Sequence, residues 1–177
     1  MTQLVGNDGL KPDGTCCTVR AVGDTAPDFR MSFQNEVRLG GLSFWVLLDW
    51  QRGGEAINLL RFLQDTSSNS PDYETSGRER QQRFATTTRA YLEDTTFLKV
   101  REVALGYALP ENWYRGVLPG VRQVRLSASA RDVLTLTGYS GLDPEVGGSE
   151  NAPLLRNLEL FPRPPSRSAW LSLDVGF

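Results

Sequence analysis

Residues 28–51, DFRMSFQNEVRLGGLSFWVLLDWQ, hold two stretches in which apolar and polar residues alternate. Apolar side chains fall mainly on odd positions from Phe29 to Leu39 and on even positions from Leu42 to Trp50. Because successive side chains of a strand point to opposite faces, each stretch predicts a strand with one apolar and one polar face. Only a Gly-Gly pair separates the two stretches, which is typical of a tight β-hairpin.

Three later stretches alternate in the same way. In one of them the apolar phase changes between Val100 and Val103. A β-bulge at the two residues between them would explain the slip, and so would a strand that leaves its apolar surroundings. The chain ends in SAWLSLDVGF, where the odd positions are all apolar: Ala169, Leu171, Leu173, Val175 and Phe177. The predicted strands lie near residues 27–39, 41–51, 96–109, 121–136 and 168–177.

The connections between these strands differ in length. Residues 40–41 and 110–120 form the short ones, whereas 52–94 and 138–167 are long and polar. Since consecutive connections of an antiparallel meander alternate between its two ends, both short links fall at one end and both long loops at the other. This asymmetry is typical of outer-membrane barrels, and strands of ~9–11 residues match a tilted transmembrane strand.

The two faces support the same interpretation. Charged side chains are expected to line a water-filled lumen from the polar face: Arg30, Glu36, Arg38, Arg125 and Arg131. Aromatic side chains near the strand ends are expected at the two lipid interfaces: Phe29, Trp50, Tyr107 and Phe177. We therefore expect an all-β fold, an antiparallel meander of about five long strands that forms a curved open sheet with long loops at one end. A soluble sheet with its apolar face on a core has the same periodicity and remains the alternative.

Composition excludes several classes of protein. The 177 residues include no histidine, which removes Ser-His-Asp and Cys-His catalytic arrangements and the usual zinc sites. A net charge of −2 gives no basic surface for nucleic acid. The longest apolar run, FWVLL, is far shorter than a membrane-spanning helix. Cys16 and Cys17 are adjacent, and we interpret them as two loop cysteines rather than a vicinal disulfide.

Three segments resemble the late barrel of SusC/RagA-type TonB-linked outer-membrane transporters. VGDTAPDFRMSFQNEVRLGGLSFWVLLDWQRGGEAINLLRF (22–62) is similar to the G-x-x-x-P-D-F segment of that family, with its strand, short turn and second strand. YLEDTTFLKVREVALGYALPENW (91–113) is similar to D-x-S-F-L-R-L-K-N-V-x-L-G-Y-x-L-P, and LSASARDVLTLTGYSGLDPEVGG (126–148) to V-x-x-x-N-L-L-T-x-T-x-Y-x-G-x-D-P-E-V-G-G. The ending LSLDVGF matches the aromatic-terminated last strand. Asp132 replaces the family's Asn, and Lys99 its frequent Arg.

The resemblance runs from about Val22 to Phe177 and carries functional expectations. It implies the C-terminal fragment of a 22-stranded barrel in a gram-negative outer membrane, with a periplasmic C-terminus and a terminal strand that acts as a barrel-assembly signal. The parent protein would import oligosaccharides or peptides with energy from the TonB complex, and a SusD-like surface lipoprotein would cap it. The fragment alone would not transport, because the TonB-coupling region is missing.

Few other residues suggest chemistry. Tyr139, Asp143, Glu145 and Trp170 are weak candidates for contact with the substrate or lid. The carboxylates of GLDPEVGGSE, Asp143, Glu145 and Glu150, lack EF-hand spacing, so a calcium site is the less favoured interpretation. No catalytic residue, metal ligand or cofactor is predicted. Two functions remain: a portion of a nutrient transporter, or a small soluble β-sheet module that binds carbohydrate.

Overall fold

The computed structural model describes residues 3–145 and 164–177. It divides into two compact units, which are treated separately below. The sheet unit comprises Met31–Trp50, Leu98–Leu136 and Pro165–Phe177, and the loop unit comprises Met1–Arg30, Gln51–Phe97 and Thr137–Pro164. Among the described residues, no helix is both long enough and apolar enough to cross a membrane.

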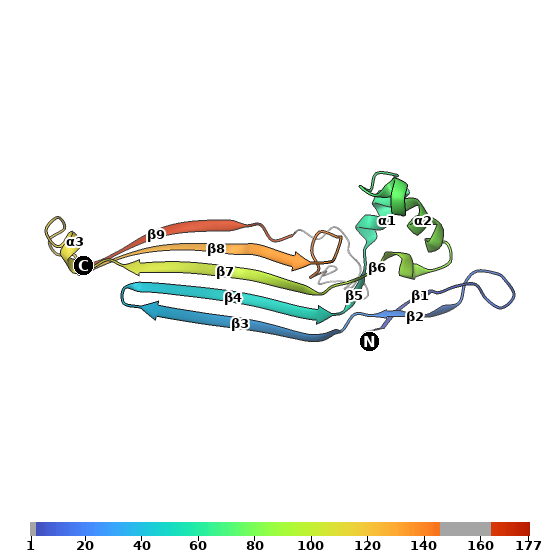
Figure 1. The fold of residues 1–177 in the computed structure, drawn as a ribbon, viewed down its shortest axis with the longest axis horizontal. Helices are drawn as coiled ribbons and strands as arrows, with labels where there is room; N and C mark the ends of the chain where they lie inside the picture. The colour runs from blue at the N-terminus through green and yellow to red at the C-terminus, as the bar shows by residue number, and fades with distance from the viewer. Residues whose placement is uncertain (1–2, 146–163) are drawn as a thin grey trace. The chain divides into compact units, whose positions relative to one another are not determined.

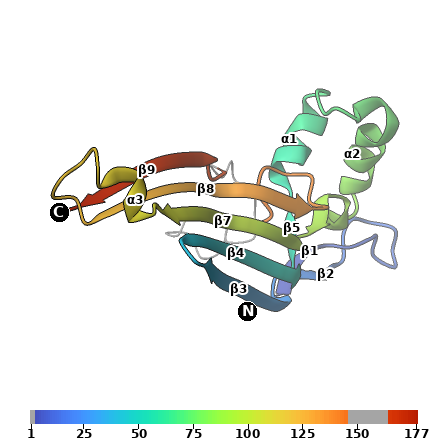
Figure 2. The ribbon, with the colours of Figure 1, turned by 60° about the vertical axis from the view of Figure 1, so that its left-hand side comes forward.

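Five long strands form the main sheet. They are β3 (Pro27–Leu39), β4 (Leu42–Gly53), β7 (Phe97–Ala108), β8 (Gln123–Thr137) and β9 (Ser168–Gly176). Their order is β3-β4-β7-β8-β9, and they lie side by side in both ribbon views (Figures 1 and 2). The sheet is antiparallel and open, with β3 and β9 at its edges, which confirms the predicted fold class.

The register between β8 and β9 matches residues of like chemistry. Ala128 pairs with Leu171 and Leu126 with Leu173, while Ser127 pairs with Ser172. Paired residues of an antiparallel ladder point to the same face, so the apolar residues of both strands share one face and the polar residues share the other.

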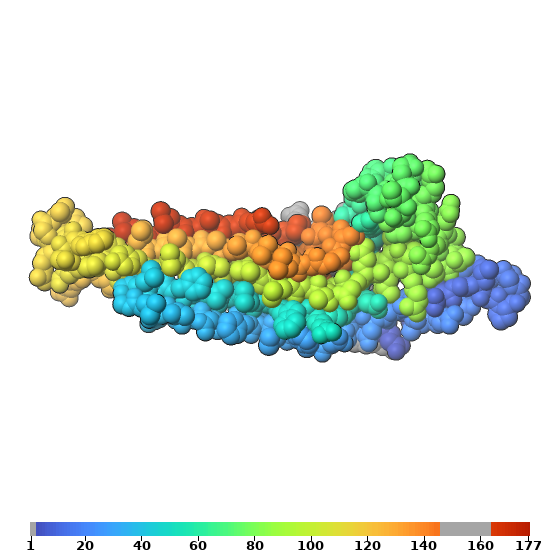
Figure 3. All heavy atoms as spheres, in the orientation of Figure 1, coloured from blue at the N-terminus to red at the C-terminus, as the bar shows by residue number. Residues whose placement is uncertain are grey.

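The apolar face is exposed. Leu171 and Leu173 are 75% and 64% exposed, and every residue of β3 is exposed. The space-filling view shows one face of all five strands uncovered (Figure 3). The large apolar side chains that the strands expose include Met31, Phe33, Val37, Leu42, Phe44, Leu105 and Leu126.

The β3–β4 turn depends on its two glycines. Gly40 has a φ of +58°, in the left-handed region that glycine adopts readily. At Gly41 an added Cβ would lie 2.6 Å from the carbonyl oxygen of Ala108. The Gly41 carbonyl also accepts a hydrogen bond of 2.8 Å from the backbone N–H of Ala108, so the turn packs directly against the end of β7.

The N-terminal residues form a hairpin that the sequence did not predict. Strands β1 (Gln3–Asn7) and β2 (Val19–Asp24) pair antiparallel, with an irregularity between Leu4 and Val5. The interpretation of Cys16 and Cys17 as separate loop cysteines was wrong: a disulfide joins them across a cis peptide bond.

Most of the connection between β4 and β7 is folded. It contains β5 (Glu55–Ile57), α1 (Leu59–Thr66), the π-helical turn η1 (Tyr73–Gly77), α2 (Arg78–Phe84), the 3-10 turn η2 (Thr88–Tyr91) and β6 (Leu92–Asp94). Strands β5 and β6 pair antiparallel, which closes the segment at its base. The side chain of Asn58 caps α1 by accepting a hydrogen bond from the backbone N–H of Arg61.

An aromatic cluster forms the core of this helical segment. The ring of Phe62 lies 4.8 Å from that of Phe84, and each lies 5.4 Å from the ring of Tyr91. Tyr91 is 1% exposed. These tilted and edge-on contacts are the preferred geometry of aromatic pairs.

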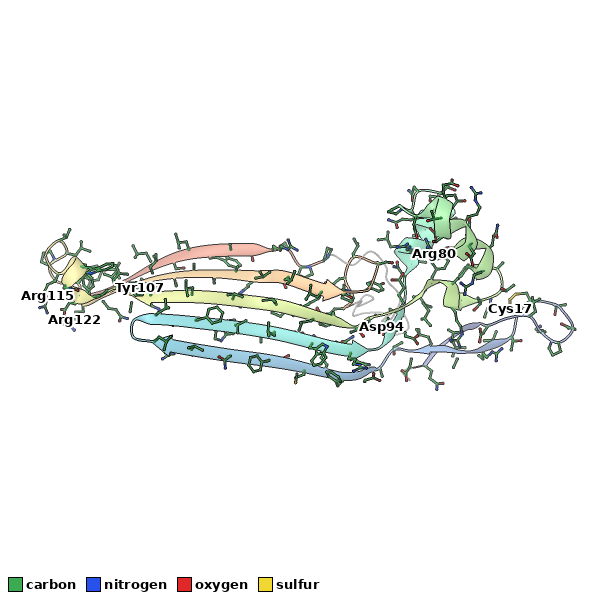
Figure 4. The ribbon with its side chains drawn as sticks, viewed as in Figure 1. Cys17, Arg80, Asp94, Tyr107, Arg115 and Arg122 are labelled. Atoms are coloured by element: carbon green, nitrogen blue, oxygen red, sulfur yellow. A yellow bond between two sulfur atoms is a disulfide. The ribbon has the colours of Figure 1, made fainter. Side chains whose placement is uncertain are left out.

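Beside this core lies a cluster of charged side chains centred on Arg80 (Figure 4). Its guanidinium donates two hydrogen bonds of 2.9 Å to the fully buried carboxylate of Asp65 and bonds of 2.8 and 3.0 Å to Asp72. Arg61 donates to Asp72 at 2.6 Å, and the hydroxyl of Ser70 donates to Asp65. We name Asp65, Asp72, Arg61 and Arg80 the Arg80 cluster.

The Arg80 cluster changes the pKa of both acids. Hydrogen bonds from Arg80, opposed by burial and helped by the charge of Arg61, hold the pKa of Asp72 well below its ordinary value. Burial raises the pKa of Asp65, but hydrogen bonds from Arg80 and Ser70 outweigh it and lower the pKa overall. Both carboxylates are therefore ionised at neutral pH.

We expect Arg80→Ala to destabilise the helical segment. The substitution leaves the Asp65 carboxylate buried without a cation, which costs about 3–5 kcal/mol of local stability. Hydrogen exchange of peptides from α1 and α2 in detergent would show the loss of protection. Arg78→Ala is the matched control, because Arg78 is 59% exposed and its two contacts, an ion pair with Glu74 and a cation–π contact with the Tyr73 ring, are each worth about 1 kcal/mol or less. Equal effects of the two substitutions would contradict the role of the Arg80 cluster.

The stability of this segment should also depend on pH. A carboxyl whose pKa is lower in the folded than in the unfolded state stabilises the fold above the unfolded pKa, and the stabilisation is lost as pH falls through the folded pKa. For Asp65 and Asp72 the ordinary value is 3.8, so the loss begins near that pH and grows below it. Hydrogen-exchange protection of α1 and α2, corrected for the intrinsic exchange rate, should be level from pH 7 to 5 and fall in stronger acid.

Candidate functional site

The polar face of the sheet carries a network of ionic contacts. Arg101 donates to the carboxylate of Asp49 at 2.8 Å and lies 3.9 Å from that of Asp132. The hydroxyl of Ser32 donates to Asp49 at 3.3 Å. Asp49 is only 5% exposed, so its contacts with Arg101 and Ser32 offset the cost of burying the charge.

A second ion pair follows beside the first. Arg131 donates to Glu102 at 3.1 Å, and its guanidinium lies 5.3 Å from the centre of the Trp170 ring. This is a cation–π distance. Glu102 is the chain neighbour of Arg101, yet both contact residues of the polar face, which strict alternation forbids. A bulge at these two residues, which stays a prediction, is consistent with the geometry.

A third contact lies nearer the short connections. Arg125 donates to the hydroxyl of Ser43 at 2.8 Å, and that hydroxyl donates to the carbonyl of Gly106 at 3.3 Å. An added Cβ at Gly106 would lie 2.8 Å from the Arg125 guanidinium. The absence of a side chain on Gly106 therefore leaves space for the arginine to lie across the face.

In the loop unit, two of the predicted site residues, Arg30 and Glu145, form an ion pair. Arg30 donates to Glu145 at 2.6 Å, and its guanidinium lies 5.7 Å from the centre of the buried Phe97 ring. Both charged residues line a polar cavity of about 250 Å³ together with Gln51 and Glu55. Pockets for drug-sized ligands measure roughly 300–1,000 Å³, so this cavity suits one polar group of a larger solute.

The loop after β8 is tied to the segment that precedes β7. The hydroxyl of Ser140 donates to Glu93 at 2.7 Å and accepts from the side chain of Asn58 at 3.1 Å. Tyr139 and Asp143 are 6% and 8% exposed. These two residues are therefore largely buried, which favours a structural role over direct contact with a solute.

The structure brings some of the predicted residues together and not others. Arg30 meets Glu145, and Arg131 meets Trp170, while Glu36 and Arg38 form an exposed pair with each other at 2.7 Å. Asp143 accepts a hydrogen bond of 2.9 Å from the backbone N–H of Glu145. Glu150 of the considered calcium loop lies outside the described residues, and no cluster of three or more acidic or thiol side chains suited to a metal occurs within them.

Sequence reasoning missed the residues that organise the polar face. Asp49, Arg101, Glu102 and Asp132 were not among the predicted site residues. The sequence signal for two of them was the change of apolar phase between Val100 and Val103. At such a change, the consecutive charged residues Arg101 and Glu102 can both point to the polar face. The resulting surface alternates positive and negative groups and can hydrogen-bond a polar solute.

Two curated relatives of the chain are TonB-dependent receptors. No family model matches the chain. TonB-dependent receptor P3 of Formosa agariphila is 28% identical over 142 residues, a match that covers 71% of this chain and 14% of the relative. TonB-dependent receptor P39 of the same organism is 24% identical over 151 residues and is likewise matched over 14% of its length. The chain thus corresponds to a small part of these relatives.

Solved structures share the fold. The RagAB peptide importer in its open-open state superposes with a TM-score of 0.61 at 19% identity, over 99% of this chain and 21% of that one. Its closed-closed state gives a TM-score of 0.60 at 18% identity, over 93% and 20%. The chain is thus similar in sequence to TonB-dependent receptors and similar in fold to the SusC/RagA-type RagAB importer.

Proposed function

We propose that the chain forms part of the barrel wall of an outer-membrane transporter that imports bulky nutrients, either peptides or oligosaccharides. The observation that carries this proposal is the opposite chemistry of the two sheet faces. One face is apolar and exposed, and the other carries the ion pairs of Arg101 and Arg131. Lipid suits the first face and a water-filled lumen suits the second.

The extent of the apolar face argues for lipid. Soluble proteins rarely expose contiguous apolar patches above a few hundred Å². Here the exposed apolar residues run along all five strands, from Phe33 in β3 to Leu173 in β9. Each Å² of apolar surface removed from water stabilises by roughly 25 cal/mol, so a membrane offers a large gain that an aqueous surface does not.

The polar face supports passage of a polar solute. Arg101 and Arg131 are balanced by nearby carboxylates, which leaves hydrogen-bonding groups without a large excess of one charge. In the loop unit, Arg30 and Glu145 separately give the polar cavity groups of both signs. Such a surface fits uncharged glycans and zwitterionic peptides. The similarity in fold to the RagAB peptide importer favours peptides.

The remaining expectations belong to the whole transporter. TonB-dependent receptors act in the outer membrane, and we propose that location here with a periplasmic C-terminus. We also propose that the barrel has 22 strands, that the strand from Ala169 to Phe177 serves as its assembly signal, and that Phe29, Trp50, Tyr107 and Phe177 lie at the lipid interfaces. The TonB complex would supply energy and a SusD-like lipoprotein would cap the long loops.

We expect Leu171→Arg to prevent stable membrane insertion. On the proposed lipid face, an arginine near the bilayer midplane costs about 2–4 kcal/mol. The measurement is urea-induced unfolding, followed by tryptophan emission, of the chain reconstituted in phospholipid vesicles.

Ser172→Arg is the matched control for that substitution. Ser172 is the next residue of the same strand and is also exposed, but it points to the polar face, where an arginine should be tolerated. A soluble carbohydrate-binding sheet, the alternative function, predicts that both variants stay folded and dissolve without detergent. Equal stability of the two variants in vesicles would contradict the proposal that the apolar face contacts lipid.

A further inference from the structure

The connection between β7 and β8 presents an apolar patch that the proposed function does not use. Trp113, Val117 and Leu118 are 65%, 78% and 44% exposed. They lie in and directly after the short helix α3 (Glu111–Tyr114). We name these three residues the connection patch.

Internal contacts hold the connection patch in place. Tyr114 is 7% exposed, and its hydroxyl donates to the carbonyl of Arg122 at 3.0 Å. The backbone N–H of Leu118 donates to the carbonyl of Tyr114 at 2.8 Å. Because Tyr114 anchors the connection to the residue just before β8, the outward position of Trp113 and Val117 is a property of the folded loop.

The connection patch is continuous with the apolar face. The ring of Trp113 lies 6.4 Å from that of Tyr107, at an interplanar angle of 59°. Tyr107 lies two residues after the exposed Leu105 on the apolar side of β7. The aromatic pair therefore extends the apolar face beyond the end of its strand.

Cationic side chains accompany the connection patch. Residues 110–122 contain Arg115 and Arg122 against the single acid Glu111. Arg115 pairs with Glu111 at 2.5 Å with both side chains more than half exposed, and Arg122 is exposed. Figure 4 shows Tyr107, Arg115 and Arg122 near one another at the end of the sheet unit where the C-terminus lies.

We propose that the connection patch is an interfacial anchor that inserts into the headgroup region of a phospholipid leaflet. This proposal rests on the proposed function, since it requires lipid against the apolar face. Tryptophan is enriched at this depth because its ring is amphipathic, and arginine extends from apolar surface to reach phosphate. A protein partner would instead need a surface matched to both the apolar residues and the flanking arginines, and nothing in the described chain points to one.

The test measures the depth of Trp113 in the bilayer. The full chain and Trp113→Phe are reconstituted in vesicles of phosphatidylethanolamine and phosphatidylglycerol doped with brominated lipid, and the difference in their emission isolates Trp113. Bromines near the headgroup end of the acyl chain should quench this signal more than bromines near the methyl end, while aqueous acrylamide should quench it little. Quenching by acrylamide alone, or protection from both quenchers, would overturn the anchor.

A second variant separates this proposal from the function on which it rests. Leu171→Trp places a new fluorophore on the apolar face, and its added emission should be quenched most by bromines near the methyl end. If bromolipid quenches the emission added by Leu171→Trp but not that of Trp113, the barrel wall stands and the anchor is wrong. If it quenches neither, lipid does not contact the apolar face and both proposals fail.

Discussion

Antiparallel pairing in register is the constraint on which both faces of the sheet depend. Between β8 and β9, each apolar residue from Leu126 to Ala130 opposes an apolar one, and Ser127 opposes a serine. A register shift of one residue in β9 would move the side chains of Leu171 and Leu173 to the face that carries Arg125 and Arg131. Each face would then mix charged and apolar side chains. The separation of the apolar face from the polar face therefore depends on register as much as on composition.

The polar face departs from strict alternation where its charge is densest. Arg101 and Glu102 are consecutive, as are Arg131 and Asp132, yet all four engage partners on the same face. Asp132 has a φ of +50°, a conformation that Asp and Asn adopt more readily than other residues with a side chain. The family pattern has Asn at this position, so the substitution preserves the local backbone and adds a carboxylate next to Arg101.

Periodicity was sufficient to predict the five long strands, because their two environments differ so sharply. It also located the slip at Arg101 and Glu102. It did not predict the N-terminal hairpin: β1 and β2 are short, contain glycine and lack clear alternation. It could not show that Arg80 brings together Asp65 and Asp72, since that contact depends on how the helices pack. The pairings of Arg131 with Trp170 and of Arg30 with Glu145 likewise depend on tertiary positions that spacing does not specify.

The helical segment between β5 and β6 has a consequence for how the chain folds. Its stabilising contacts are close in sequence: Arg80 lies 15 residues from Asp65 and 8 from Asp72. Contacts of this kind form quickly, whereas contacts across the sheet such as that of Ser43 with Arg125, 82 residues apart, require closure of much longer loops. The segment can thus be complete while β4 and β7 are still unpaired. The pairing of β5 with β6 then brings the end of β4 close to the start of β7. The loop that must close before these two long strands pair is therefore shorter.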